Sequence, residues 1–214
     1  MTSVVLVRHG QASWDAEDYD RLSALGADQS ATLGRAMVGL AAPDLVMSGA
    51  HLRHRDTAGL AMEAAGWQLP VQVDTGWNEF DHRLVLAAYG TAPPEEGTAA
   101  FGRWFHEALA RWTEGGSDAD YDEPFASFTS RVDVALRHLR GELGPSDTAV
   151  VFTSAGPICW TVAALLGGQT QVWLHLLPSL VNASITRIRL DARGMHLTTF
   201  NEHSHLGPES VTFW

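Results

Sequence analysis

The sequence predicts an α/β protein: a three-layer αβα sandwich with a mostly parallel central sheet and a helical capping insertion. Short apolar runs at 4–7, 44–48 and 148–153 indicate buried strands, and each is followed by a stretch with helical character. Alternating strands and helices are typical of parallel sheets covered by helices on both faces. The alternation stops over 77–124, which we interpret as an insertion within a single domain, 1–214.

The size and composition of the chain fit one soluble domain. It has 214 residues, of which 45% are hydrophobic, enough for a full core. No run of 18 apolar residues predicts a membrane span, and the first strand begins too early to leave room for a signal peptide. Cys159 is the only cysteine, so we expect no intrachain disulfide and a cytoplasmic location.

The charge of the chain restricts its partners. The net charge of −11 argues against nucleic acid, because binding to a phosphate backbone needs a basic face. All 14 basic residues are arginine, which excludes lysine Schiff-base chemistry and the Walker-type phosphate loop. Arginine forks suit phosphate, so a small phosphorylated substrate is the expected ligand, with no membrane partner. The sequence leaves open whether two copies form a homodimer.

The first third of the chain contains the expected strands and helices in alternation. Ser23 is a suitable N-cap for the first helix, and Gly66 a suitable end for the second. The expected elements are a helix over 23–40, a strand over 44–48, a helix over 51–65 and a strand over 71–73.

The rest of the chain begins with the insertion and then returns to alternation. Between the third strand and residue 143 we expect two helices, and afterwards a strand, a helix with Pro157 at its first position, and two paired strands. Trp104, Phe105 and Trp112 are interpreted as packing residues of the insertion. The expected ranges are helices at 98–113 and 125–143, a strand at 148–153, a helix to about 166, and strands at 182–190 and 195–200.

The first strand ends in residues that carry chemistry. Its apolar run leads directly into Arg8, His9 and Gly10. In open α/β sheets, ligands bind at the carboxyl ends of the strands. His9 can act there as nucleophile, acid–base or metal ligand, while Arg8 supplies a fixed positive charge. Gly10 allows a sharp turn and the close approach of a ligand.

A second cation lies where the next strand gives way to a helix. The strand ends at Ser48, and Arg53 follows at the start of the helix. Free N–H groups at a helix start favour anions, and a guanidinium adds charge-assisted hydrogen bonds to phosphate oxygens. Arg55, two residues later, is interpreted as a residue of the helix surface.

Two carboxylates follow the third strand. Glu79 lies between Trp77 and Phe80, which are expected to shield it from water and raise its pKa, as a general acid requires. Asp81, two residues on, would share an extended face with Glu79. The sequence does not decide which of the two is the acid.

These motifs together resemble the histidine phosphatase superfamily, the phosphoglycerate-mutase-like enzymes. The resemblance rests on Arg-His-Gly after the first strand, on the arginine at residue 53 with Thr-Ala after it, on the glutamate at 79 and on the closing Asn-x-x-x-His-Leu at 201–206. It implies that His9 is the nucleophile, that Arg8 and Arg53 hold the phosphoryl oxygens, and that Glu79 protonates the leaving group. No metal or other cofactor is implied, and His203-x-His205 is interpreted as structural.

The sequence departs from the superfamily in two places. The fourth strand of the superfamily usually ends in a second histidine, and Ser154 stands there, followed by Ala155. A hydroxyl and free N–H groups can still bind phosphate, but the cation of the second histidine is gone. Asp15 occupies the place of a phosphate-binding asparagine. The residues expected to bind the rest of the substrate are Gln11, Ser13, Asp15, Asp81 and His82.

The resemblance favours a phosphomonoesterase. It would hydrolyse a small phosphorylated metabolite through a phosphohistidine on His9. One alternative is a phosphoglycerate-type mutase. Asp15 and the loop from His9 to Leu22, which is several residues shorter than in the mutases, argue against it. The other is a phospho-ligand binding protein with weak or no turnover, because Ser154 replaces the second histidine.

Overall fold

A six-stranded mixed sheet forms the centre of the protein, seen in a computed structural model that describes residues 1–13, 20–39, 42–168 and 170–213. The strand order is β3-β2-β4-β1-β5-β6. The first four strands of that order are mutually parallel, whereas β5 runs antiparallel to β1 and β6 antiparallel to β5. The strands are β1 (Thr2–Arg8), β2 (Leu45–Ser48), β3 (Val71–Val73), β4 (Thr148–Thr153), β5 (Ile185–Asp191) and β6 (Gly194–Glu202).

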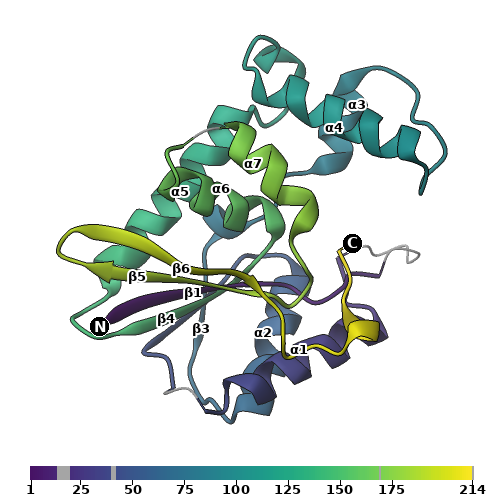
Figure 1. Cartoon of the computed structure of the whole chain (residues 1–214). Helices are drawn as coiled ribbons and strands as arrows, with labels where there is room; N and C mark the ends of the chain where they lie inside the picture. The colour runs from purple at the N-terminus through teal and green to yellow at the C-terminus, as the bar shows by residue number, and fades with distance from the viewer. Residues whose placement is uncertain (14–19, 40–41, 169, 214) are drawn as a thin grey trace.

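Helices cover both faces of this sheet, which confirms the predicted three-layer αβα fold. Figure 1 shows α1 and α2 together on one face, and α5, α6 and α7 on the other, with α3 and α4 stacked beyond them. The helices are α1 (Ala24–Met37), α2 (Leu52–Ala65), α3 (His82–Tyr89), α4 (Ala99–Thr113), α5 (Phe125–Glu142), α6 (Ala155–Leu165) and α7 (Thr170–Leu176).

Side-chain alternation along the central strands builds two cores. Val4 and Leu6 of β1 point to the face under α5 and α6, while Val5 and Val7 point to the face under α1 and α2. Successive side chains of a strand lie on opposite faces, so an uninterrupted apolar run fits a strand that is covered on both sides. The four β1 side chains are at most 5% exposed, and the strand is therefore fixed in register.

An aromatic cluster joins the insertion to the helices above the sheet. Trp112 of α4 packs on Phe80, with ring centroids 4.8 Å apart, and on Phe128 of α5 at 5.6 Å. Phe125 and Trp173 lie 5.1 Å apart in the same cluster. These residues belong to one apolar core with the sheet residues Val4 and Leu6, among others. This shared core supports the prediction of a single domain with an insertion over 77–124, which stays a prediction.

The predicted elements agree with the structure to within two residues at each boundary, except at five points. The first helix ends at Met37 rather than near 40, and the fifth strand begins at Ile185 rather than at 182. Helices α3 and α7 were not expected, because both are short and bury only one or two apolar side chains. Pro157 is the third residue of α6, not the first, since Ser154 is the N-cap. Proline fits there because the first N–H groups of a helix have no intrahelical partner.

Helix ends follow the sequence signals. The Ser23 hydroxyl accepts a hydrogen bond from Gly26 N at 3.0 Å and caps α1, as predicted. Gly66 ends α2 with φ of +72°, a conformation that glycine adopts without strain. None of the helices in the described ranges is long and apolar enough to cross a bilayer.

The aromatic cluster gives the first prediction. Trp112→Ala should lower the free energy of unfolding by about 3–5 kcal/mol, because it leaves a cavity among fully buried rings. Val134→Ala on the exposed side of α5, where Val134 is 52% exposed, should change that free energy by about 0.5 kcal/mol or less. Urea denaturation of both variants measures these changes. Similar decreases in the free energy of unfolding would show that the aromatic cluster does not anchor the insertion to the sheet.

Candidate active site

Three neighbouring strands bring the candidate residues to one edge of the sheet. Strand β4 lies between β1 and β2, so the carboxyl ends of all three are adjacent. His9 follows β1, Ser154 follows β4, and Arg53 lies in the first turn of the helix after β2. The three residues are buried, with exposures of 6%, 0% and 6% respectively. The structure thus brings together polar groups that are up to 145 residues apart in the chain.

The imidazole of His9 is held in one tautomer. Its Nδ1 lies 2.7 Å from the carbonyl oxygen of Gly10, which can only accept a hydrogen bond, so Nδ1 carries the proton. The Nε2 atom then has a free electron pair, and Arg53 Nε donates a hydrogen bond to it at 3.3 Å. Burial, followed by the charges of Arg53 and Arg8, holds the pKa of His9 well below 6.5. The arrangement leaves a neutral nucleophilic nitrogen beside a guanidinium.

The loop after β1 is packed tightly against α1, and this fixes the position of His9. A Cβ on Gly10 would lie 2.3 Å from the carbonyl oxygen of Gly26, so only glycine fits. Gly10 N also donates to Thr57 Oγ1 at 3.0 Å. The carbonyl oxygen of His9 accepts from Asn182 Nδ2 at 3.2 Å.

Arg53 is paired with an acidic residue that the sequence analysis did not single out. Its Nη1 donates to Asp20 Oδ1 at 2.6 Å, and Leu52 N donates to Asp20 Oδ2 at 2.7 Å. Asp20 therefore neutralises part of the charge of Arg53 and caps the start of α2. The predicted surface residue Arg55 is exposed on the same helix.

Glu79 lies at the start of α6. Gly156 N donates to Glu79 Oε2 at 3.1 Å, and a Cβ on Gly156 would lie only 2.1 Å from Oε1. The helix start thus admits the carboxyl group only because residue 156 is glycine. Burial raises the pKa of Glu79 above 4.5, although the Gly156 N–H and the charges of Arg53 and Arg8 oppose the rise. A raised pKa is what a general acid needs.

Asp81, the rival carboxylate, has a different task. It is exposed, and its Oδ1 accepts hydrogen bonds from Arg83 N at 2.9 Å and Leu84 N at 3.2 Å. These bonds make Asp81 the N-cap of α3. The geometry therefore favours Glu79 as the acid.

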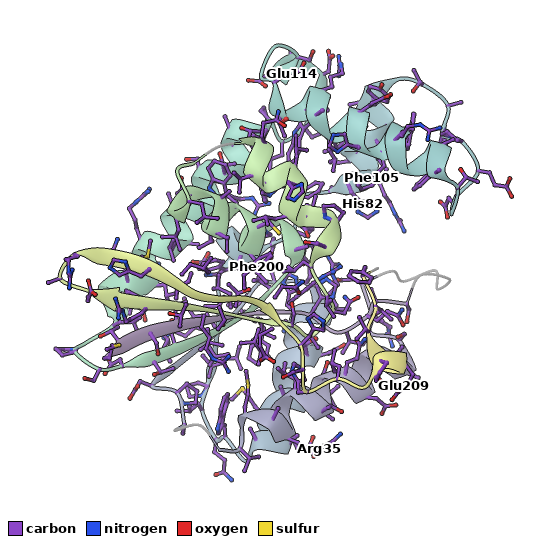
Figure 2. The ribbon with its side chains drawn as sticks, viewed as in Figure 1. Arg35, His82, Phe105, Glu114, Phe200 and Glu209 are labelled. Carbon is purple, nitrogen blue, oxygen red and sulfur yellow. The ribbon has the colours of Figure 1, made fainter. Side chains whose placement is uncertain are left out.

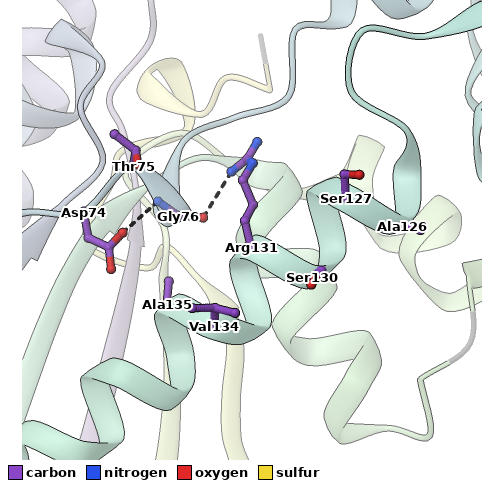
Figure 3. A pocket seen from close by; sticks show the side chains of 9 residues that line it. All are labelled: Asp74, Thr75, Gly76, Ala126, Ser127, Ser130, Arg131, Val134 and Ala135. Carbon is purple, nitrogen blue, oxygen red and sulfur yellow. Dashed lines mark hydrogen bonds between the residues drawn. The ribbon is translucent and has the colours of Figure 1, made fainter.

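A second unpredicted residue, Arg131 of α5, holds the loop that carries Glu79. Its guanidinium donates to the carbonyl oxygens of Gly76, Asn78 and Glu79 at 3.1, 2.6 and 3.3 Å. It also forms two hydrogen bonds with the Glu123 carboxylate. Figure 3 shows Arg131 reaching from α5 to Gly76, beside a surface hollow. Three of the five hydrogen bonds of this guanidinium thus fix the loop, and the other two orient the guanidinium itself.

Arg8 is placed differently from the expectation. Its Nη2 donates to the carbonyl oxygen of Phe213 at 2.8 Å, and its Nη1 donates to that of Leu180. The guanidinium therefore ties β1 to the C-terminal segment. Its charge still reaches the site, because it helps to lower the pKa of His9 and that of Glu79.

The imidazole of His54 lies beside Ser154. His54 Nε2, from α2, lies 2.6 Å from Ser154 Oγ, and the rings of His54 and His9 are 5.6 Å apart. His54 and Ser154 are both fully buried. Ala155, the first residue of α6, is 6% exposed. The sequence predicted no second imidazole here, because the superfamily pattern places the second histidine directly after the fourth strand, where this chain has Ser154.

The residues expected to bind the rest of the substrate are scattered. Gln11 Oε1 accepts from Ser23 Oγ at 2.9 Å, and Ser13 Oγ donates to the Leu22 carbonyl at 3.0 Å, so both close the first loop. His82 begins α3 on the insertion (Figure 2), and burial lowers its pKa. Asp15 lies outside the described residues.

The polar side chains of the closing motif contact neighbouring main-chain groups, and the structural role expected for His203 and His205 stays a prediction. Asn201 Oδ1 accepts from Val181 N at 2.8 Å, and its Nδ2 donates to the Ser179 carbonyl at 2.7 Å. The ring of His205 lies 3.1 Å from the Ala183 carbonyl oxygen. Among the described residues, no three of the types His, Cys, Asp and Glu cluster as a metal site would require.

Comparison with known proteins identifies the family of the chain. The sequence model of the histidine phosphatase superfamily (branch 1) matches residues 4–203, so the chain belongs to that superfamily of phosphoryl-transfer enzymes. None of the curated proteins matches the sequence.

Several solved structures share the fold. A phosphoserine phosphatase from Entamoeba histolytica is 20% identical, with a TM-score of 0.69 over 96% of this chain and 99% of that one. A putative α-ribazole-5′-P phosphatase from Escherichia coli is 20% identical, with a TM-score of 0.70 over 97% and 100%. A phosphoglycerate mutase from Bacillus anthracis is 16% identical, with a TM-score of 0.70 over 95% and 94%. These likenesses establish the fold.

The depressed pKa of the two buried imidazoles gives a second prediction. Burial and neighbouring positive charges disfavour the protonated forms of His9 and His54. Both rings should therefore stay neutral as the pH falls through 6.5, the value of a free imidazole. NMR titration of the ring Cε1–H signals, assigned with His9→Ala and His54→Ala, measures this. Protonation of either ring at or above pH 6.5 would contradict the described environment.

Proposed function

We propose that the protein is a phosphomonoesterase that hydrolyses a small phosphorylated metabolite through a phosphohistidine on His9. The observation that carries this proposal is the state of the His9 ring. Its Nδ1–H is engaged with Gly10, its Nε2 electron pair is free of a proton, and Arg53 lies 3.3 Å from Nε2. A neutral nucleophile next to a cation suits attack on a phosphate ester.

The first step transfers the phosphoryl group to the protein. The electron pair of His9 Nε2 forms a bond to phosphorus while the ester P–O bond breaks. The leaving oxygen takes the electron pair of that bond and a proton from Glu79, whose raised pKa keeps the proton available. In the second step, water attacks phosphorus, its proton passes to the Glu79 carboxylate, and the P–N bond breaks to regenerate His9.

Positive charge and hydrogen-bond donors stabilise the transferred group. Arg53 supplies the nearest guanidinium, and we propose that it binds the phosphoryl oxygens in place of part of its contact with Asp20. Ser154 and Ala155 lie at the start of α6, where the helix dipole favours an anion. Arg8 acts through its charge and by fixing the strand that carries His9.

The alternatives have less support. Transfer to a second hydroxyl, as in a mutase, would need a second phosphate site, and nothing in the geometry of the described ranges favours one. A binding protein without turnover does not need a shielded carboxyl with a raised pKa beside the nucleophile, which Glu79 provides.

The nucleophile can be tested by trapping. With His9→Ala, hydrolysis of p-nitrophenyl phosphate should fall by about 10⁴-fold or more, since covalent catalysis is lost. The unsubstituted protein, denatured during turnover of ³²P-labelled substrate, should carry acid-labile and base-stable phosphate. Gln72→Ala is the control, because Gln72 is exposed on β3 and belongs to none of the candidate site residues. Label on a residue other than His9 would refute the mechanism.

The general acid has a distinct signature in the leaving group and in pH. Glu79→Gln should slow an alkyl phosphate by about 10²–10⁴-fold and p-nitrophenyl phosphate much less, because nitrophenolate scarcely needs a proton. A general acid must be protonated, so activity on alkyl phosphates should fall as the pH rises through the raised pKa of Glu79. That basic limb should vanish in Glu79→Gln.

Asp81→Asn serves as the matched control for this prediction. Because asparagine caps a helix about as well as aspartate, Asp81→Asn should keep α3 intact and leave the dependence on the leaving group unchanged. If Asp81→Asn shows the selective loss and Glu79→Gln does not, the acid has been misassigned.

A further inference from the structure

We propose that His54 is the second imidazole of the phosphoryl pocket and positions the Ser154 hydroxyl for a phosphoryl oxygen. This inference rests on the proposed function and names a residue that the known motifs of the chain do not include. His54 sits on α2 next to Arg53, whereas Ser154 sits at the end of β4. The two elements meet because β2 and β4 are paired.

Contacts place His54 inside the site. Its side chain is fully buried, its Nε2 is 2.6 Å from Ser154 Oγ, and its ring centroid is 5.6 Å from that of His9. The ring of His51, whose side chain is 32% exposed, lies 5.1 Å from that of His54 in an edge-on arrangement. His54 thus links α2, the helix that carries both His54 and Arg53, to the end of β4, which carries Ser154.

The surroundings of Nδ1 select the tautomer of His54. Gly49 passes so close that a Cβ on it would lie 2.2 Å from Nδ1, and the structure shows no hydrogen-bond partner for Nδ1 within the described residues. A bare electron pair tolerates such a contact better than an N–H group does, because an unmet donor costs its full desolvation. The proton therefore lies on Nε2 and is donated to Ser154 Oγ.

This direction of the bond decides what Ser154 can do. A serine hydroxyl has one proton and two acceptor positions. When Oγ accepts from His54, its own proton is free to be donated elsewhere. A phosphoryl oxygen bound beside His9 and Arg53 is the acceptor that the pocket provides. The polarised hydroxyl then replaces part of the positive charge that a histidine at position 154 would supply.

A packing role alone does not explain this histidine. An apolar side chain would fill the same volume without burying an unpartnered nitrogen, which costs free energy. Gly49 is required to admit the ring, so two positions are specialised for it. Burial and the neighbours His9, Arg53 and His51 lower the pKa of His54, which favours its neutral form.

The arrangement also bears on substitutions of Ser154. Because Ser154 Oγ lies only 2.6 Å from His54 Nε2, a larger imidazole at residue 154 would clash with the ring of His54. Ser154→His alone should therefore not improve phosphate binding. Only removal of the His54 ring would make room for an imidazole from β4.

Four variants test the proposal: His54→Ala, His54→Gln, Ser154→His and the double variant His54→Ala/Ser154→His. The readouts are the inhibition constant for inorganic phosphate, kcat and KM for p-nitrophenyl phosphate, and the melting temperature. His54→Ala should weaken phosphate inhibition by about tenfold, the loss of one directed hydrogen bond. His54→Gln, which keeps an N–H donor, should recover part of that loss.

The double variant is the decisive comparison. It should bind phosphate more tightly than His54→Ala, while Ser154→His alone should bind more weakly than the unsubstituted protein. His138→Gln, which removes an exposed imidazole on α5, is the control and should leave the inhibition constant within about twofold.

The outcomes separate this inference from the proposed function. If the unsubstituted protein neither hydrolyses the ester nor binds phosphate, both fail together. If it is active but His54→Ala keeps its phosphate inhibition constant, or the double variant is no better than His54→Ala, the role of His54 is refuted alone. A fall in melting temperature without a change in the phosphate constant likewise identifies a structural residue.

Discussion

The pairing of β4 between β1 and β2 is the constraint on which the site depends. His9 N donates to the Thr153 carbonyl at 2.9 Å, and Gly49 N donates to the Phe152 carbonyl at 3.0 Å, so both flanking strands leave the sheet at the end of β4. The registers are specified because all side chains beyond the first one or two residues of each of these strands are buried. A slip in either pairing would separate the nucleophile from the guanidinium and from the start of α6.

The acidic and basic groups of the site have pKa values shifted in opposite directions. Burial raises the pKa of the Glu79 carboxyl and lowers the pKa values of the His9 and His54 rings, because it disfavours every charged form. Arg53 forms an ion pair with Asp20 at 2.6 Å. These shifts favour a neutral acid and neutral imidazoles beside a guanidinium, a distribution that suits a phosphate ester.

Much of this could be predicted from the sequence, because it rests on local patterns. Apolar runs ended by glycine located the strands, and His9 and Arg53 followed from their places at a strand end and a helix start. His54 could not be found in this way: its partner, Ser154, is 100 residues distant, and no periodicity links them. Arg131 binds main-chain carbonyl oxygens, and Asp20 forms a salt bridge with Arg53. Neither kind of contact requires a recognisable sequence motif.

A crystal structure with orthovanadate tests the central claim most directly. Vanadate adopts the trigonal-bipyramidal geometry of the transition state for phosphoryl transfer, so it should bond to His9 Nε2 at one apical position. Its oxygens should lie within hydrogen-bond distance of Arg53 and of Ser154 Oγ, with His54 Nε2 still on that hydroxyl and Glu79 facing the apical oxygen. Vanadate bound elsewhere with His9 bare, or a Ser154 hydroxyl turned away from the anion, would contradict the account.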